Sequence, residues 1–217
     1  MSLELHSHPF ASFCQKVLIA LYENQTPFQA VFVDLGDPAS RAAFLKLSPT
    51  GKMPALRDAA RGQTLFETSI IIEYLNQYYP GRTALIPADP DLARQTRLLD
   101  RFYDLYVSEP MQKIVGDRLR PPGEGDAYGV AEAKAALRKA YALIDERLGE
   151  QTWELGEAFS MAECSAAPAL HYADLVEPFG TAYPRLSAYL QRLRERPSYA
   201  RVVREAEPYA HLLPQET

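Results

Sequence analysis

The chain has 217 residues, of which 47% are hydrophobic and 24% charged, so it can bury the core of one large domain or of two small ones. Its net charge of -5, with no basic stripe interleaved with aromatic residues, argues against nucleic acid as the main partner. No run approaches the ~18 consecutive apolar residues of a membrane span, so we expect no membrane insertion.

The cysteines and histidines show no pattern of metal ligands. Cys14 and Cys164 are far apart and form neither a Cys-x-x-Cys motif nor a zinc-ligand spacing. The four histidines also lack such spacing, and no glycine-rich phosphate loop is present, so we expect no metal. The N-terminus has no basic segment followed by an apolar one, unlike a secretory signal. A reduced, cytoplasmic protein is therefore expected.

The first part of the chain alternates between strand and helix patterns. In chain order, hydrophobic periodicity predicts a strand beginning at Leu3, a helix over Ser12–Asn24, a strand over Gln29–Val33, a helix over Pro38–Leu47, two further strands and a helix over Thr68–Tyr79. Short connections and right-handed crossovers leave few topologies for this order. We expect a thioredoxin-like α/β domain over residues 1–81, with βαβαββα order and a mixed four-stranded sheet.

The rest of the chain is predicted to be helical. The polar, proline-containing segment over residues 82–92 has the composition of a linker, and residues 93–217 show no persuasive strand, which predicts an all-α domain. Pro110 is expected to kink or end the first helix of this domain. The clearest later helical patterns cover Ala131–Leu148 and Tyr183–Arg196.

One helix start in this domain has a complete signal. Ser160 and Glu163 have the spacing of a capping box, in which each residue satisfies a backbone donor of the other. Phe159, just before the cap, is placed to pack onto Cys164. This arrangement predicts a structural role for Cys164.

Lys52, Met53 and Pro54 form the most informative motif of the first domain. A proline at the head of a strand needs no ladder donor, so Pro54 lies where an N–H can be dispensed with. A tight turn there, with a cis bond before Pro54 as one way to form it, would turn the backbone of Met53 outward like a sheet edge. An extended peptide can pair with such an edge. The alternative is an ordinary turn before a strand.

Gly-Lys-Met-Pro-Ala-Leu, followed downstream by Thr-Leu-Phe-Glu-Thr-Ser, resembles the core of the glutathione transferase superfamily, and the resemblance covers nearly the whole chain. It implies that Met53, before a cis Pro54, pairs with the cysteinyl backbone of glutathione, and that Glu67 and Thr68 hold its γ-glutamyl end. It further implies a homodimer in which the two domain types pair across a two-fold axis. It does not assign a class within the superfamily.

The residue chemistry suits an extended, acidic tripeptide. Glu67 can accept the γ-glutamyl ammonium, while the Thr68 hydroxyl and the amides of its helix N-terminus can hold the neighbouring carboxylate. Lys52 can approach the glycine carboxylate as a point charge. The alternatives are helix capping with an acidic first turn for Glu67 and Thr68, and a solvated turn lysine for Lys52.

A transferase must also favour the glutathione thiolate, because a free thiol with a pKa near 8.5 is only a few per cent ionised at neutral pH. A hydroxyl aimed at the sulfur, together with a helix N-terminus, would lower that pKa. Ser12, at the start of the first helix, is the first candidate. Ser12 and Gln15 also fit a capping box, in which the Ser12 hydroxyl would be committed to a backbone donor.

The superfamily pattern places Ala11 at the usual catalytic serine or cysteine, and alanine can play neither role. The functional hydroxyl is then either shifted by one residue, to Ser12, or absent. Cys14 falls where the second cysteine of a thioredoxin-type Cys-x-x-Cys would lie, and a helix N-terminus can lower a cysteine pKa, so Cys14 is the second catalytic candidate. The alternative is a structural cysteine packed against its own helix. His8 is a further candidate, and otherwise a loop residue after the first strand.

The electrophile should bind across the cleft, in a mostly apolar pocket facing the helical domain. The candidate lining residues are Phe10, Tyr103, Tyr106 and Met111. An aromatic stripe at helical spacing can equally belong to the core.

These observations predict a glutathione transferase that uses glutathione as co-substrate to attack a small hydrophobic electrophile. A second hypothesis is glutathione-dependent thiol–disulfide exchange or peroxide reduction, with glutathione itself or Cys14 as the thiol. A third, which follows from Ala11, is a non-catalytic glutathione-binding docking protein. Isomerase and dehalogenase activities, both found in the superfamily, also remain open.

Overall fold

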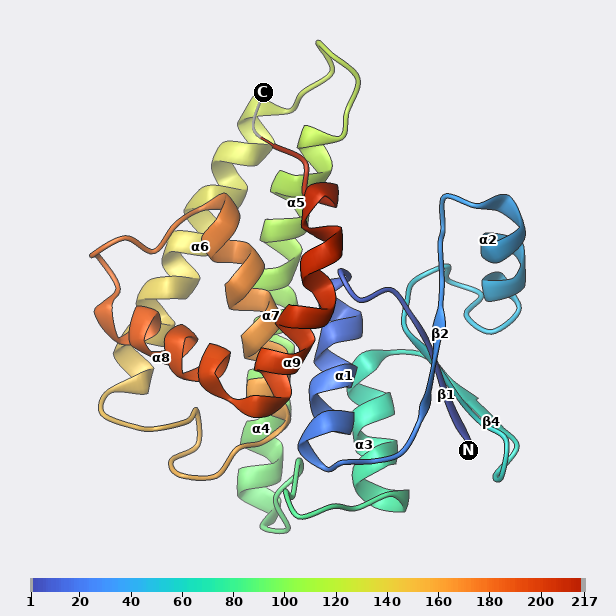
Figure 1. Cartoon of the computed structure of the whole chain (residues 1–217). Helices are drawn as coiled ribbons and strands as arrows, with labels where there is room; N and C mark the ends of the chain where they lie inside the picture. The colour runs from blue at the N-terminus through green and yellow to red at the C-terminus, as the bar shows by residue number, and fades with distance from the viewer. Residues whose placement is uncertain (1, 216–217) are drawn as a thin grey trace.

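The computed structural model describes residues 2–215 and contains two packed domains (Figure 1). The first domain consists, in chain order, of β1 (Leu3–Ser7), α1 (Ser12–Glu23), β2 (Gln29–Phe32), α2 (Pro38–Leu45), β3 (Ala55–Asp58), β4 (Gln63–Leu65) and α3 (Thr68–Tyr78). The sheet order is β2-β1-β3-β4, with β1 parallel to β2 and antiparallel to β3, and β4 antiparallel to β3. The predicted thioredoxin-like domain is therefore confirmed.

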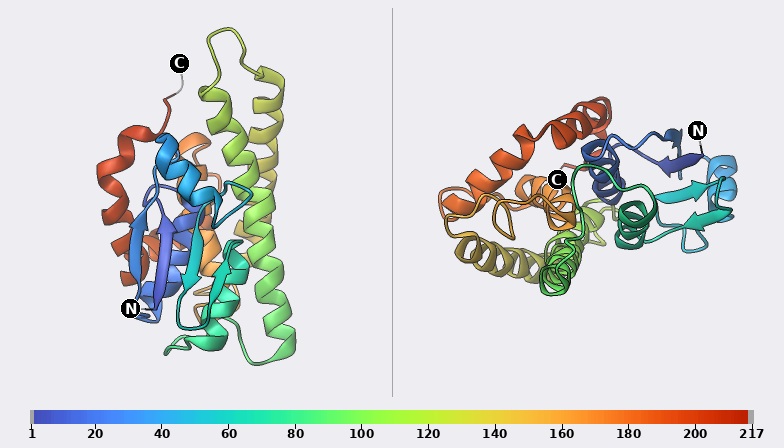
Figure 2. Two further views of the ribbon diagram at one scale, coloured as in Figure 1. Left: turned by 90° about the vertical axis from the view of Figure 1, so that its right-hand side faces the viewer. Right: turned by 90° about the horizontal axis from the view of Figure 1, so that it is seen from below.

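The sheet is covered on both faces. Helices α1 and α3 lie between the sheet and the second domain, and α2 lies on the opposite side of the sheet (Figures 1 and 2). In β1, the side chains of Leu3, Leu5 and Ser7 are buried in alternation with half-buried ones, as expected for a strand with unequal faces. Leu5 stands opposite Ala30 of β2 and Leu56 of β3, which fixes the register at the centre of the sheet.

The second domain is helical, as predicted. It consists of α4 (Pro90–Phe102), the π-helical segment η1 (Tyr103–Ser108), α5 (Glu109–Arg118), α6 (Ala127–Leu148), α7 (Met161–Val176), α8 (Pro184–Glu195), α9 (Pro197–Ala206) and the 3-10 segment η2 (Glu207–Leu212). Helix α7 lies at the centre of this domain and is buried along nearly its whole length. Helix α4 begins at Pro90, within the segment predicted as a linker, and the domain boundaries at residues 81 and 93 stay predictions. None of the helices within residues 2–215 has the length and apolar character of a membrane span.

Pro110 does not end or kink its helix, contrary to our expectation. Helices α4 and α5 are joined through η1 into one long rod (Figure 2). Pro110 lies in the first turn of α5, directly after η1. The wider i→i+5 turns of a π-helical segment have already displaced the α-helical hydrogen-bond ladder there, so the missing N–H of proline is tolerated.

The predicted capping box of α7 is confirmed. The Ser160 hydroxyl accepts a hydrogen bond from the Ala162 N–H at 3.1 Å, and the Glu163 carboxylate accepts one from the Ser160 N–H at 2.7 Å. Cys164 is fully buried in the core just behind this cap, and burial raises the pKa of its thiol well above the usual value. Its environment fits the structural role that was predicted for it.

Candidate functional site

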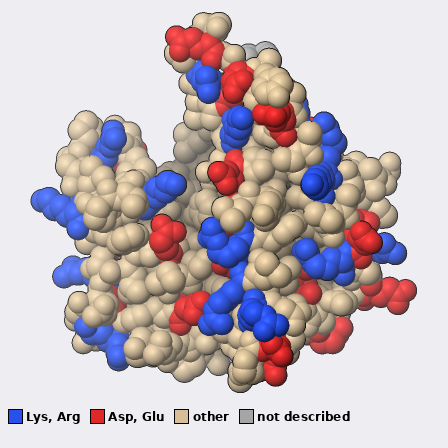
Figure 3. Space-filling view, turned by 180° about the vertical axis from the view of Figure 1, so that it is seen from behind, with Lys and Arg blue, Asp and Glu red and all other residues tan. Residues whose placement is uncertain are grey.

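A cavity of about 370 Å³ lies between the two domains. Its wall consists of Phe13, Lys52, Met53, Pro54, Glu67 and Thr68 from the first domain and of Arg101, Asp104, Leu105, Glu109 and Gln112 from the second. The molecule is hollowed between the domains, with positively and negatively charged side chains around the hollow (Figure 3). The cavity brings together all five residues that the sequence singled out for glutathione binding.

The loop before β3 presents an unpaired stretch of backbone. The peptide bond between Met53 and Pro54 is cis. Within residues 2–215, no hydrogen bond is found to the backbone N–H or C=O of Met53. The buried Ser48 hydroxyl donates to the carbonyl of Lys52 at 2.9 Å, which holds the turn in place. The main-chain groups of Met53 are therefore available to an extended peptide in the cavity.

Glu67 has a strained backbone at the entrance to α3. Its φ of 71° lies in the left-handed region, which costs a non-glycine residue about 1–3 kcal/mol and is concentrated at functional sites. Glu67 is the N-cap of α3, yet its side chain accepts no capping hydrogen bond. The capping alternative for Glu67 is therefore wrong. Its exposed carboxylate and the buried Thr68 both face the cavity at the positive end of the helix.

Ser12 is not the cap of α1, so the capping-box alternative is wrong as well. The N-cap is Ala11, and none of the side chains that the structure describes caps this helix. Gln15, the expected partner of Ser12, is buried and donates from Nε2 to the Pro9 carbonyl at 3.0 Å. Ser12 is half-buried, and its hydroxyl forms no hydrogen bond with another residue in the range 2–215. Ser12 is not itself a residue of the cavity wall, but it directly precedes Phe13, which is.

Cys14 does not have the environment of a reactive cysteine. Its side chain is fully buried, and burial raises the pKa of its thiol to about 12, although the nearby backbone of His8 opposes this shift. The helix N-terminus therefore does not lower the pKa of Cys14, because desolvation of the thiolate outweighs it, and the environment fits the alternative of a structural cysteine. Cys14 is also absent from the cavity wall.

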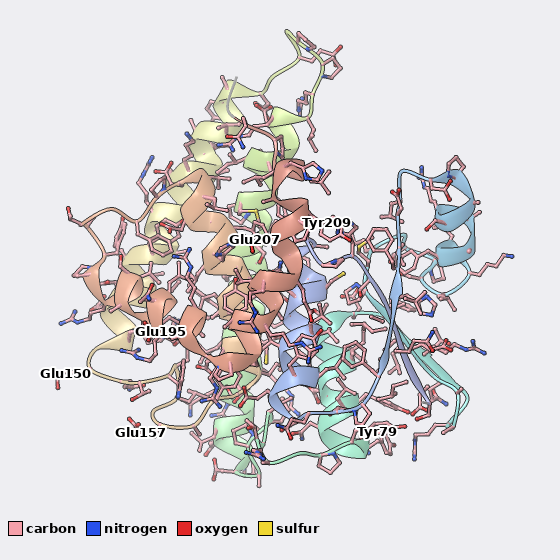
Figure 4. The ribbon with its side chains drawn as sticks, viewed as in Figure 1. Tyr79, Glu150, Glu157, Glu195, Glu207 and Tyr209 are labelled. Carbon is pink, nitrogen blue, oxygen red and sulfur yellow. The ribbon has the colours of Figure 1, made fainter. Side chains whose placement is uncertain are left out.

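His8 is a loop residue in an aromatic cluster. Its Nδ1 accepts a hydrogen bond from the Phe10 N–H at 3.1 Å. Its ring lies 5.0 Å from that of Phe32 and 4.8 Å from that of Tyr209, which approaches the first domain from the C-terminal segment (Figure 4). Burial lowers the pKa of His8, which favours the neutral ring.

None of the four residues proposed for the electrophile pocket lines the cavity. Tyr103 is fully buried and donates to Glu154, and Met111 is buried in the same core, because this face of the α4–η1–α5 rod packs against α7. The ring of Phe10 packs edge-on against Tyr172. Tyr106 is 58% exposed and packs against Phe102, outside the cavity.

The cavity wall of the second domain is polar, whereas we expected an apolar one. Four of its five members, Arg101, Asp104, Glu109 and Gln112, are charged or carry an amide. They recur at helical spacing along the rod and form one polar stripe. This spacing was the signal that could have identified them in the sequence. Arg101 donates to Asp104 at 3.2 Å.

Asp104 connects the cavity to a buried ionic cluster at the domain interface. Lys16 of α1 is 1% exposed, and its ammonium lies 2.6 Å from Asp100 and 2.9 Å from Asp104. The hydroxyls of Ser69 and Ser165 each donate to Asp100 at 2.6 Å. Burial raises the pKa of Asp104 although the positive charge of Lys16 opposes the shift. The cluster fixes this part of the cavity wall against α1.

The sequence matches two family models in tandem. The glutathione S-transferase N-terminal domain model covers residues 10–77, and the glutathione S-transferase C-terminal domain model covers residues 89–192. The chain belongs to the glutathione S-transferase family. Its enzyme class is that of the glutathione S-transferases.

Individual relatives agree with this glutathione S-transferase assignment. GstB of Escherichia coli strain K12 is 26% identical over 190 residues, which cover 87% of this chain and 91% of GstB. A glutathione S-transferase of Pseudomonas putida is 28% identical over 218 residues, covering 94% and 93% of the two chains.

Solved glutathione S-transferase structures have the same fold. A Methylobacillus flagellatus enzyme with glutathione bound has a TM-score of 0.85 at 24% identity, covering 93% of this chain and 98% of that one. A Methylobacterium radiotolerans enzyme in complex with glutathione sulfonate has a TM-score of 0.81 at 26% identity, covering 93% and 94%.

Proposed function

We propose that this glutathione S-transferase binds glutathione in the interdomain cavity and activates its thiol for attack on an electrophile. The observation that carries the proposal is the convergence of Met53, Glu67 and Thr68 on one cavity beside the start of α1. There, Ser12 has a hydroxyl without a partner among residues 2–215. The glutathione and glutathione sulfonate complexes of the two structural relatives support the same ligand.

Each part of glutathione has a complementary group in the proposed site. The cysteinyl backbone pairs with the unpaired N–H and C=O of Met53. The γ-glutamyl ammonium contacts Glu67, and its carboxylate takes the Thr68 hydroxyl and the amides at the N-terminus of α3. Lys52 faces the glycine carboxylate as a point charge. This orientation directs the thiol toward the first turn of α1.

In the proposed reaction the thiol proton is lost to solvent, and the Ser12 hydroxyl donates a hydrogen bond to the sulfur anion that remains. The partial positive charge at the N-terminus of α1 adds to this stabilisation. The sulfur then forms a bond to an electrophilic carbon, and either a leaving group departs or, in an addition, the neighbouring atom takes up a proton. Ser12 stays protonated throughout, so its role is that of an anion-stabilising donor.

The polar stripe on the second domain, which includes Arg101, Glu109 and Gln112, indicates which kind of electrophile the cavity accepts. A wall of this composition favours an electrophile that carries polar groups beside its reactive carbon, because a purely hydrocarbon surface would leave these side chains desolvated and unpaired. We therefore propose a small electrophile with polar substituents as the co-substrate class.

We also propose that the protein is a homodimer in the cytoplasm. Ile70 of α3, Leu98 of α4 and Tyr106 of η1 are all more than half exposed, and such apolar side chains on neighbouring helices suit burial against a second subunit. The two free cysteines suit a reducing compartment. Sedimentation equilibrium tests the subunit number, and a monomer at micromolar concentration would contradict it.

The thiol proposal is tested by titrating bound glutathione against pH and following the ultraviolet absorbance of the thiolate. In the wild type, the bound thiol should ionise well below its free pKa. In Ser12→Ala its pKa should rise by about 1–2 units, because a hydrogen bond to a charged group contributes about 1.5–3 kcal/mol. Ser187→Ala is the matched control, since Ser187 is also half-buried near a helix start but lies on α8.

Three outcomes would redirect the proposal. Binding with an unshifted thiol in the wild type would contradict thiol activation and favour the docking or exchange hypotheses. No binding would contradict the site itself. Loss of activity in Cys14→Ser, with glutathione binding intact, would favour exchange through a protein thiol, whereas the buried position of Cys14 leads us to expect nearly unchanged conjugation.

A further inference from the structure

The loop that leads from β1 to Ser12 is held by buried side chains from both domains. Gln15 of α1 donates from Nε2 to the Pro9 carbonyl and to the Tyr172 hydroxyl, at 3.0 Å each. The hydroxyl of Tyr172, on α7, in turn donates to the Phe10 carbonyl at 2.7 Å. Two successive loop carbonyls are thus fixed by one connected chain of hydrogen bonds that crosses the domain interface.

This hydrogen-bond chain is shielded from water. Gln15 is 1% exposed and Tyr172 is 5% exposed. The rings of Phe10 and Tyr172 meet edge-on at 5.4 Å, which covers the hydrogen bond between these two residues. Hydrogen bonds in such a low-dielectric setting are stronger than in water, and losing one leaves a buried group unpaired. Burial raises the pKa of Tyr172, so its hydroxyl remains a neutral donor over the working pH range.

The position of Ser12 depends on this loop. Its own hydroxyl has no anchor among residues 2–215, and no side chain caps α1. The backbone just before it is fixed by the Pro9 and Phe10 carbonyls and by a hydrogen bond from the Ala11 N–H to the His8 carbonyl at 3.1 Å. Tyr172 is the residue through which α7 enters this arrangement.

We propose that Gln15 and Tyr172 are positioning residues for thiol activation, holding the loop so that the Ser12 hydroxyl meets the sulfur of bound glutathione. This rests on the proposed function, in which Ser12 stabilises the thiolate. The second domain thereby contributes to the reaction through a residue that touches neither substrate. A displacement of about 1 Å at the donor is enough to weaken a hydrogen bond whose strength depends steeply on distance and angle.

The test compares Tyr172→Phe with Tyr199→Phe. The first variant keeps the ring against Phe10 but removes the donor to the Phe10 carbonyl and the acceptor for Gln15. The second is a matched control, because Tyr199 is also fully buried in the second domain but its hydroxyl has no hydrogen-bond partner in the described part of the chain. Glutathione binding, the pKa of the bound thiol and the pH dependence of kcat are measured for both.

For Tyr172→Phe, we expect the pKa of the bound thiol to rise by roughly one unit, which is a tenfold loss of thiolate well below that pKa. The kcat should fall by a similar factor at low pH and recover toward the wild-type value at high pH, while KM for glutathione changes less than about twofold. Tyr199→Phe should match the wild type throughout. Gln15→Met, which fills the same space without the amide, should show the same pH shift.

A merely structural role for Tyr172 would give a different result. If Tyr172→Phe and Gln15→Met keep the wild-type pKa of the bound thiol, or lose kcat equally at all pH values, the positioning role is overturned. Should Tyr172→Phe not fold, Gln15→Met decides by the same criterion. If the wild type itself shows no lowered thiol pKa, the proposed function fails first, and that result is separate from any difference between the variants.

Discussion

The ammonium of Lys16 lies 2.6 Å from the carboxylate of Asp100, although the two residues belong to different domains and neither is more than 2% exposed. Asp104 is the second partner of Lys16, and Ser69 and Ser165 donate to Asp100. Buried charges are tolerated when each is paired and hydrogen-bonded, as here. The ion pair therefore forms part of the interface between the domains.

Lys16→Met should destabilise the protein by about 3–5 kcal/mol, because it removes the positive partner of the buried Asp100 and one positive partner of Asp104, which keeps its contact with Arg101. Lys139→Met is the control, since Lys139 is exposed on α6 and should change stability by less than about 0.5 kcal/mol. Urea unfolding of both variants measures the difference. A Lys16→Met protein as stable as the control would show that the cluster contributes nothing to the interface. Adding Asp100→Asn and Asp104→Asn to Lys16→Met should recover part of the loss.

Substitutions of two glutamates in the cavity wall should affect the two substrates differently. Glu67→Gln removes the proposed partner of the γ-glutamyl ammonium and should weaken glutathione binding by tenfold or more, about 1.4 kcal/mol. Glu109→Gln changes the opposite wall and should alter the KM for the electrophile, with glutathione affinity within about twofold of the wild type. Calorimetric titration of both variants with glutathione measures whether the affinity falls in Glu67→Gln and not in Glu109→Gln. Equal losses in both variants would mean that glutathione spans the whole cavity.

The raised pKa of Glu163 predicts that the folded protein loses stability as the pH rises. Burial raises the pKa of this carboxyl from 4.5 to about 7, more than the N–H donors of Ser160 and Glu154 lower it. Between pH 4.5 and about 7, Glu163 therefore keeps its proton in the folded state and has lost it in the unfolded state. The stability that this proton contributes is complete below pH 4.5 and disappears as pH rises through about 7, with a full size of about 3 kcal/mol.

The measurement compares the free energy of unfolding of the wild type with that of Glu163→Gln across this pH range. The stability of the wild type relative to Glu163→Gln should fall as the pH rises from 4.5 to about 7, since glutamine does not titrate. Glu150→Gln serves as the control, because Glu150 is exposed at the edge of the helical domain (Figure 4). A constant difference between wild type and Glu163→Gln would contradict the raised pKa.

The lowered pKa of His171 predicts that the folded protein loses stability as the pH falls. Burial, and then the positive charge of Arg194, lower the pKa of His171 to about 4, and Arg194 lies 3.2 Å from its Nδ1. The neutral ring must take up a proton when the chain unfolds below pH 6.5. Its contribution is therefore complete above pH 6.5 and is lost as pH falls through about 4, again by about 3 kcal/mol. His171→Gln should remove this acid-side loss, and His211→Gln, at an exposed position, should not.

The effects of Glu163 and His171 overlap in pH and oppose each other. The wild type should therefore show a flatter stability profile between pH 4.5 and 6.5 than either variant. A steep wild-type profile, with both variants parallel to it, would exclude both assignments.

The order of strands and helices was predictable because local signals agreed with the fold. The alternating pattern after Leu3 fits a strand with unequal faces, and the Ser160–Glu163 capping box starts α7 as expected. Pro110 was misjudged because its effect depends on the turn before it. A π-helical segment has no reliable local sequence signal, so its presence could not be inferred.

The parts of the site that a single segment forms could be predicted from the sequence. The parts that depend on how the two domains pack could not. The Lys52–Pro54 turn and the Glu67–Thr68 helix start are local motifs, and the cavity contains both. Gln15 and Lys16 are polar residues of α1, yet both are buried, because the helix lies between the sheet on one side and the second domain on the other. Tyr103 lies in the core because its face of the α4–η1–α5 rod packs against α7 within the second domain.

A charge that is neutralised only across the domain interface has a consequence for recombination between related genes. If a hybrid enzyme took its first domain from this chain and its second from a relative without Asp100 and Asp104, it would carry an unmatched lysine in its interior. The reverse hybrid would enclose Asp100 without its lysine, while Asp104 would keep its contact with Arg101. Lys16, Asp100 and Asp104 would therefore have to be inherited together, which limits where crossovers in such genes yield folded proteins.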